Sequence, residues 1–253
     1  MFVEERQEKI LAILKEKRKL SVTDMSERFN VSGATIRTDL RLMEEAGLLT
    51  RTHGGAIMRT RVSFEIGSDQ RESLNLSAKE LVGQRAAGLV EDGDIIVLDT
   101  GTTTLHIAQH LRERRNLTVV TNDFMIARTL EDFDGVQTIL LGGMVKKGYH
   151  CVTNWSNQSM LDTLNIDKAF MGVNAFSLQR GACVADMLLA ETKRQMVQHA
   201  NQLIIVCDHS KLNSTSLAQF APSERVDTLV VDRLPEENSE AWHDSGIALL
   251  GVE

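Results

Sequence analysis

Apolar residues in the first 47 positions recur at the spacing of amphipathic helices. Residues 10–14 place four apolar side chains on one face of a charged segment, which predicts a first helix. A second helix follows Ser21, whose hydroxyl is suited to cap it. After a turn at residues 30–32, Ser32 is expected to cap a third helix that ends at Gly47. The predicted inward-facing residues of the second and third helices are Met25, Phe29, Ile36, Leu40 and Met43.

A glycine-rich hairpin is predicted directly after the third helix. Residues 48–56 read LLTRTHGGA and suit two short strands joined near Gly54 and Gly55. Helix, turn, helix and hairpin in this order form a winged helix-turn-helix, which binds DNA. The alternative, a solvated amphipathic helix with incidental arginines, does not explain why cap, turn, core spacing and hairpin occur together.

The candidate DNA contacts lie at the start of the third helix and in the hairpin. A recognition helix reads the major groove with its N-terminal end. There Arg37 can chelate a guanine, Thr35 can meet a base edge or a phosphate, and Arg41 is placed for the backbone. His53 has two open interpretations, a structural role or a DNA contact. The full candidate set is Ser32, Thr35, Arg37, Thr38, Arg41, Arg51 and His53.

The remainder of the chain alternates short apolar runs with helical segments. This alternation predicts an α/β domain with a mainly parallel sheet. We expect residues 1–60 to form the DNA-binding domain, 61–76 a linker and 77–253 the α/β domain, whose first helix starts at a capping box from Ser77 to Glu80 and runs to about residue 91. The predicted strands are 95–98, 117–120, 137–141, 168–173, 202–207, 227–232 and 247–251, and the later helices are 102–114, 123–132, about 157–165 and 187–200.

Polar and glycine-rich loops follow three of the predicted strands. Residues 99–104 read DTGTTT, and the start of the helix after them can direct backbone N–H groups at an anion. Ligands of parallel α/β sheets bind at the carboxyl ends of strands, which makes these loops candidate ligand contacts. An ordinary helix cap is the alternative for DTGTTT alone. The candidate residues in these loops are Asp99, Thr100, Gly101, Thr102, Thr103, Thr104, Thr121, Asn122, Gly142 and Gly143.

Charged residues elsewhere in the domain extend this candidate site. Lys211 follows a strand and suits a phosphate, although a solvated lysine is the plain alternative. Lys146 can act similarly, and Glu191 and Lys193 are expected at the beginning of a helix. For His209, structural and ligand-binding roles both stay open.

Charge and composition support a DNA-binding head on an acidic body. Residues 1–61 hold twelve Lys and Arg against nine Asp and Glu, whereas the rest of the chain holds 16 against 26. A basic head attracts phosphate, and an acidic body leaves that head as the docking surface. The three scattered cysteines have neither disulfide nor metal-ligand spacing, and residues 1–10 are charged and lack the apolar core of a signal peptide. We therefore expect a cytoplasmic protein without cofactor, metal or membrane contact.

The segment VSGATIRTDLRLMEEAGLLTRTHGGA resembles the N-terminal signature of the DeoR family of bacterial sugar-metabolism regulators. Members usually carry TIRRDL, where this chain has Thr38 in place of the second arginine. The resemblance implies a Rossmann-like sensor domain similar to ribose-5-phosphate isomerase, which binds a phosphorylated sugar or polyol. By the same resemblance, the pocket is lined by the DTGTTT loop, Thr121, Asn122, Gly142, Gly143, Glu191, Lys193 and Lys211. The chain departs from relatives at Asn154-Trp155 and at Leu189, which affects the expected recognition of the sugar portion.

These features predict a DNA-binding transcriptional regulator, a repressor of a carbohydrate-utilisation operon that a sugar phosphate releases from its operator. A homo-oligomer, dimer or tetramer, would present paired heads to repeated half-sites. One alternative is a sugar-phosphate isomerase-like enzyme with an accessory helical head, in which Asp99, Glu191 and Lys193 supply acid-base chemistry. Another is a regulator whose body serves only for assembly.

Overall fold

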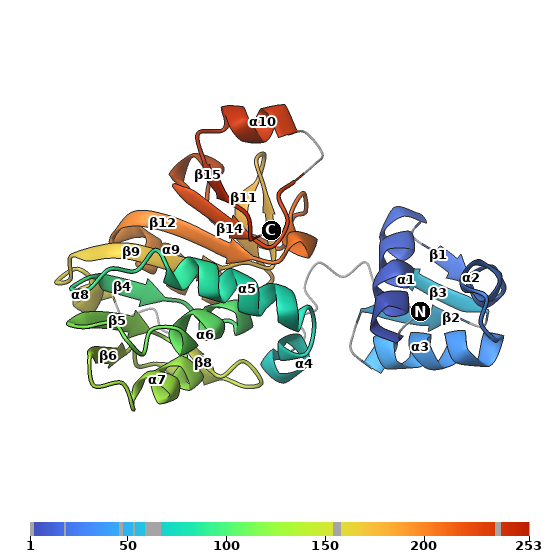
Figure 1. Cartoon of the computed structure of the whole chain (residues 1–253), viewed down its shortest axis with the longest axis horizontal. Coiled ribbons are helices and arrows are strands. Elements are labelled where there is room, and N and C mark those ends of the chain that lie inside the picture. Colours follow the sequence, from blue (N-terminus) through green and yellow to red (C-terminus); the bar gives the residue numbers. More distant parts are fainter. Residues whose placement is uncertain are drawn as a thin grey trace. The chain divides into compact units, whose positions relative to one another are not determined.

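The structure, a computed structural model, describes residues 3–17, 19–45, 48–52, 54–58, 67–153, 158–235 and 239–252. The chain divides into two compact units, Met1–Ile66 and Gly67–Glu253, called the head and the body below. Figure 1 shows both units, and each is described by itself. None of the described helices is long and apolar enough to span a membrane.

The head is a winged helix-turn-helix. Its three helices are α1 (Val3–Lys17), α2 (Val22–Phe29) and α3 (Gly33–Glu45). Strands β2 (Leu49–Thr52) and β3 (Gly55–Met58) form the predicted hairpin, and β1 (Lys19–Ser21) adds an unpredicted third strand in the antiparallel order β1-β3-β2. A side chain at Gly55 would collide with the Leu20 carbonyl of β1, so the crossing of these strands requires glycine.

The predicted caps and core of the head are confirmed. Ser21 accepts a hydrogen bond from the Asp24 N–H at 3.0 Å, and Ser32 accepts one from the Thr35 N–H at 3.1 Å. Four of the five predicted inward residues are buried, and Phe29 packs partly buried against them. Gly47, the expected end of the third helix, lies outside the described residues.

The body is built on a parallel sheet of seven strands in the order β15-β14-β12-β9-β4-β5-β6 (Figure 1). Each predicted strand is present with small shifts of its ends. The strands are β4 (Ile95–Leu98), β5 (Leu117–Thr121), β6 (Val136–Leu140), β9 (Ile166–Gly172), β12 (Ala200–Cys207), β14 (Thr228–Val231) and β15 (Ala248–Leu250).

Alternating side chains of the central strands fill two separate cores. Ile96, Leu98 and Phe170 pack on the face covered by α5 (Leu76–Ala87), α6 (Thr102–Gln109) and α7 (Phe124–Leu130). Val97 and Met171 point to the opposite face, which α9 (Met187–Gln198) helps to cover. Two buried faces explain why the strands read as continuous apolar runs rather than as alternating ones.

Several short elements of the body have no counterpart in the prediction. They are α4 (Ser68–Glu72), the hairpin of β7 (Met144–Lys146) and β8 (Cys151–Thr153), the small sheet of β10 (Ala175–Ser177), β11 (Gly181–Val184) and β13 (Ala218–Ala221), η1 (His209–Lys211), η2 (Ser223–Arg225) and α10 (Ser239–Asp244). Helix α8 (Gln158–Leu161) is shorter than predicted. Helix α4 falls within the range expected to be a linker.

The predicted capping box of the first body helix is wrong. Helix α5 begins at Leu76, one residue before Ser77, and its N-cap is Asn75 in the left-handed conformation without a side-chain cap bond. The helix also ends at Ala87 instead of near residue 91. The Asn75 side chain bonds to a residue distant in the sequence, because its amide donates to the Asp208 carboxylate at 2.9 Å. A tertiary hydrogen bond has replaced the local cap.

Candidate DNA-binding surface and effector site

The exposed face of α3 carries the predicted helix contacts with DNA. Arg37, Thr38 and Arg41 are exposed, at positions i, i+1 and i+4 of one helical face, with Ser32 exposed at its start. Thr35 is half-buried beside them. Thr38 donates its hydroxyl to the Ala34 carbonyl at 3.1 Å, so the hydroxyl is bonded to the backbone of its own helix. The opposite face of α3 is buried in the head core.

A hollow of about 440 Å³ is lined by residues of α3 and of the wing. Arg37 lines it from the helix and Arg51 from strand β2, with Gly54 and Gly55 at the hairpin. Arg51 is already bound within the head, because its Nε lies 2.7 Å from the carboxylate of Glu44. His53 lies outside the described residues. Both arginines therefore border a groove of the head, and the Glu44 carboxylate holds the Arg51 side chain in place.

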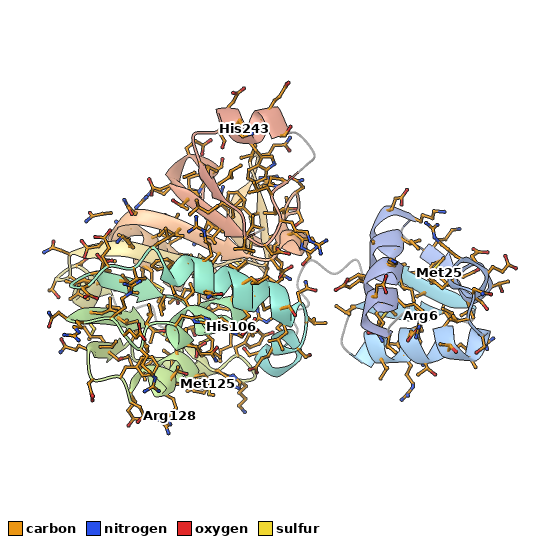
Figure 2. All side chains as sticks on the ribbon, in the orientation of Figure 1. Arg6, Met25, His106, Met125, Arg128 and His243 are labelled. Atoms are coloured by element: carbon orange, nitrogen blue, oxygen red, sulfur yellow. The ribbon has the colours of Figure 1, made fainter. Side chains whose placement is uncertain are left out.

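Sequence reasoning missed Asp39, which anchors α3. Its carboxylate accepts two hydrogen bonds from Arg6 of α1, at 2.6 Å and 3.1 Å, and both side chains are buried. Arg6 lies in the interior of the head in Figure 2. A bidentate arginine-carboxylate pair fixes distance and orientation together, so it fixes the exposed face of α3 relative to α1. The spacing of apolar residues in the sequence does not predict such a buried ion pair.

In the body, the order of the strands reverses between β4 and β9. The chain runs outward through β5 and β6 and then returns to the other side of β4 at β9. Such a switch point is where open α/β sheets bind ligands. Asp99 follows β4 at this point and Gly172 ends β9. The predicted Asp99 site therefore lies at the switch point of the sheet.

Asp99 and Lys193 form a buried ion pair at the switch point. Lys193 Nζ donates to Asp99 Oδ2 and, at 3.0 Å, to the Gly172 carbonyl. The two side chains are 0% and 3% exposed, whereas Asp99 Oδ1 is buried without a hydrogen-bond partner among the described residues. The pair thus leaves one carboxylate oxygen able to accept a hydrogen bond from a hydroxyl.

Two side chains of the DTGTTT loop form hydrogen bonds within the body, whereas the start of α6 has no side-chain cap. Thr100 donates its hydroxyl to Asp123 at 2.7 Å, and buried Thr104 donates to the Gly101 carbonyl at 2.9 Å. Gly101 has φ 162°, which is extended backbone that any residue can adopt. Helix α6 starts at Thr102 without a side-chain cap. The first N–H groups of α6, near Thr102 and Thr103, are therefore the part of the loop suited to an anion.

Thr121 and Asn122 hold neighbouring loops together. Both are fully buried. Asn122 accepts from the Thr100 N–H at 3.1 Å and donates to the Val152 carbonyl at 3.0 Å, while Thr121 Oγ1 accepts from the Asp123 N–H. Their contacts support the DTGTTT loop from beneath.

The remaining predicted ligand residues lie in different surroundings. Glu191 and Lys193 are in the second turn of α9, which begins at Met187, so the expectation that they start this helix is wrong. Glu191 pairs with Arg194 at 2.8 Å on a half-exposed face, whereas Lys193 points to the sheet. Gly142 and Gly143 are exposed after β6. Glu191 thus does not share the buried pair of Lys193.

Lys146 and Lys211 lie on different elements of the body, β7 and η1. Lys146 Nζ lies 2.5 Å from Asp186, the N-cap of α9, and 4.4 Å from the centre of the Tyr149 ring. Burial opposes the charged form of Asp186, but the hydrogen bonds from Lys146 and the Leu189 N–H outweigh it and lower its pKa. Lys211 lies in η1 directly after Asp208.

His209 contacts the carboxylate of Asp232. Its ring Nδ1 lies 2.7 Å from the Asp232 carboxylate, and its backbone N–H donates to the same carboxylate at 2.6 Å. These contacts join η1 to the end of β14.

Comparison with known proteins agrees with this two-part architecture. The family model described as "DeoR-like helix-turn-helix domain" matches residues 6–62, and "DeoR C terminal sensor domain" matches residues 74–233. The chain belongs to the DeoR family. The family resemblance and the fold class predicted from the sequence are thereby confirmed.

Relatives along the whole chain are DeoR-type regulators. The HTH-type transcriptional repressor GlcR of Bacillus subtilis is 37% identical, over 100% of this chain and 98% of that protein. The putative aga operon transcriptional repressor of Escherichia coli O157:H7 is 31% identical, over 98% and 93%. A structure of ribose 5-phosphate isomerase A from Methanocaldococcus jannaschii resembles 55% of this chain and 55% of its own, with TM-score 0.41 and 19% identity. This DeoR-family chain is a DNA-binding transcriptional regulator and not an enzyme.

Two cationic residues of the DeoR-type body escaped the sequence prediction. Lys79 of α5 is 4% exposed, and burial lowers its pKa to about 8 despite the nearby carboxylate of Asp208. Arg71 of α4 lies in the range expected to be a linker, and its guanidinium is 5.1 Å from the centre of the Tyr149 ring. A lysine on an otherwise amphipathic helix has no pattern that distinguishes it from a solvated one.

Proposed function

We propose that this DeoR-family regulator represses a carbohydrate-utilisation operon and that a phosphorylated sugar or polyol releases it from the operator. The carrying observation is the switch point of the sheet. There the buried Asp99 keeps one carboxylate oxygen without a partner among the described residues, close in the chain to the uncapped first turn of α6. A hydroxyl for the carboxylate and a phosphate for the helix N-terminus are the two halves of a sugar phosphate.

The DNA side of the proposal rests on the exposed residues of the head. Arg37 and Arg41 project from α3, and Arg51 borders the hollow next to them. Ser32, Thr35, Thr38 and the wing residue His53 complete the proposed DNA-contacting set. GlcR is named a transcriptional repressor, which supports repression as the sign of regulation. We further propose that the protein works in the cytoplasm as a homo-oligomer that presents two heads to DNA.

Thermal melting of the full chain tests the effector side. We expect one member of a panel of glycerol 3-phosphate, fructose 1-phosphate and glucose 6-phosphate, or a closely related phosphate ester, to raise the melting temperature. At 100 times its dissociation constant, a true effector adds ~2.7 kcal/mol to the free energy of unfolding. The matched unphosphorylated compounds serve as controls. Equal shifts with and without the phosphate group, or no shift with any sugar phosphate, would remove the effector from the proposal.

A further inference from the structure

One side chain, Glu44, joins the recognition helix α3 to the wing strand β2. The two elements lie side by side in the head (Figure 1). Glu44 Oε1 accepts a hydrogen bond from the Arg51 backbone N–H at 2.8 Å, and Glu44 Oε2 accepts one from Arg51 Nε at 2.7 Å. One carboxylate thus binds both the backbone and the guanidinium of the same residue, which fixes the direction of the Arg51 side chain as well as its distance from α3.

The wing needs a hydrogen-bond acceptor at this point because β2 is an edge strand. The order β1-β3-β2 leaves one side of β2 without a neighbouring strand in the part of the head that the structure describes. In an antiparallel pair, alternate N–H groups point away from the partner strand, and at an edge they have no strand to bond. The Glu44 carboxylate accepts the N–H of Arg51 instead. The outer edge of the wing is therefore attached to α3.

Glu44 lies on the face of α3 that carries the proposed DNA contacts. Arg37, Arg41 and Glu44 occupy positions i, i+4 and i+7 of this helix. Arg37, Glu44 and Arg51 line the same hollow. A carboxylate on a surface that approaches phosphates weakens DNA binding by charge repulsion. Its contact with Arg51 acts in the opposite direction if Arg51 binds DNA, so the sign of the effect of Glu44 on affinity tells the two roles apart.

The ion pair of Glu44 and Arg51 affects orientation more than stability. The two side chains are 34% and 43% exposed, and ion pairs at such exposure are screened by water and salt. A freely moving arginine loses rotamer entropy when it is ordered against a phosphate, whereas Glu44 orders Arg51 before DNA binds. The bond to Glu44 uses one of the five N–H donors of the guanidinium and leaves Nη1 and Nη2 for a phosphate.

We propose that Glu44 is a positioning residue of the DNA-binding surface, which holds Arg51 of the wing in place to bind a backbone phosphate across the hollow from Arg37. The inference rests on the proposed function, because it explains how one member of the DNA-contacting set is oriented. It adds an acidic residue to a set that consists of basic and hydroxyl side chains. Asp39 then holds α3 on α1, and Glu44 holds the wing on α3.

Fluorescence anisotropy of the full chain on a labelled duplex of mixed sequence tests the inference, because a phosphate contact forms on any sequence. Arg51→Ala should weaken the affinity about tenfold and reduce the salt slope by about 1. Glu44→Ala should weaken it about threefold or more. Glu44→Asp keeps the charge but shortens the side chain by one methylene, so it should also weaken binding. Glu8→Ala, at an exposed position of α1, is the matched control, which removes one negative charge from the head and should not weaken binding.

The double variant shows whether Glu44 acts through Arg51. In the Arg51→Ala background, Glu44→Ala should no longer weaken binding, since the side chain that Glu44 positions is gone. An equal loss in both backgrounds would overturn the inference. A gain in affinity for Glu44→Ala, or wild-type affinity for Glu44→Asp, would overturn it as well, because only the charge of Glu44 would then matter. Should Glu44→Ala unfold the head in a urea titration, Glu44→Asp decides in the same way.

Arg41→Ala separates this inference from the wider proposal. Arg41 is placed for a backbone phosphate on α3, so its loss should weaken binding independently of the wing. Unchanged affinity in Arg51→Ala alone overturns the role of Glu44 and leaves the contacts of α3 in place. Unchanged affinity in both Arg51→Ala and Arg41→Ala overturns the proposed DNA-contacting set together with the role of Glu44.

Discussion

Single side chains decide what each surface of this regulator can contact. Polar residues at the strand ends look alike in the sequence, yet the structure separates them. Asn122 joins neighbouring loops by its hydrogen bonds, and Thr104 bonds to Gly101 within its own loop. Asp99, in contrast, keeps one carboxylate oxygen without a partner among the described residues. Caps such as Ser21 and Ser32 were predictable because their partners lie three residues away. The partners of Asp99 and Lys79 are distant in sequence or belong to the backbone, so no local pattern reveals them.

We expect Arg37 to contribute most to the recognition of DNA bases. Its side chain is exposed at the start of α3 and lines the hollow beside the wing. Arg37→Ala should cost ~1–3 kcal/mol of binding to operator DNA and relax base preference at one position, because a bidentate contact with guanine is lost. A gel-shift titration against operator variants measures both. Arg128→Ala, an exposed position on α7 labelled in Figure 2, is the control. Unchanged affinity and preference would refute the role of Arg37.

Elements were predictable where the pattern is long and buried. All seven strands of the parallel sheet follow from apolar runs, and the central strands are covered on both faces. The small sheet of β10, β11 and β13 was not predictable, because its strands have three or four residues and β13 pairs with β11 from a distant part of the chain. Helix α4, of five residues, is below the length at which periodicity is informative.

The orientation of the recognition helix depends on a pair of residues rather than on the helix alone. Asp39→Ala should destabilise the head by ~3–5 kcal/mol, since Arg6 is left buried without its anion. Operator binding is expected to fall with it, while the melting shift of the body with phosphate is retained. Urea unfolding followed by gel shift measures the effect.

A double change at the same pair is the control. Arg6→Met with Asp39→Leu replaces the ion pair by apolar groups and should restore most of the stability, because a buried pair contributes little beyond its apolar substitutes. If Asp39→Ala alone left the unfolding free energy within ~0.5 kcal/mol of the wild type, the pair would not be what holds α3.

At the scale of the whole molecule, the two units differ in net charge. The basic head presents α3 and the wing, and the acidic body presents the switch point of its sheet. The division into two parts was visible in the sequence as a change of periodicity and of net charge. The contribution of residues 67–79 to the body was not visible, because mixed polarity there resembles a linker. A ligand of the body can alter the head only if it prefers one arrangement of the chain energetically.

The most direct test compares operator affinity with and without effector. Fluorescence anisotropy of the full chain on a labelled promoter fragment, at several salt concentrations, gives the dissociation constant in each state. We expect salt-sensitive binding that becomes about 5- to 150-fold weaker with a saturating sugar phosphate, which corresponds to a coupling of ~1–3 kcal/mol. The same dissociation constant in both states, for a sugar phosphate that demonstrably raises the melting temperature, would contradict control of DNA binding by the body.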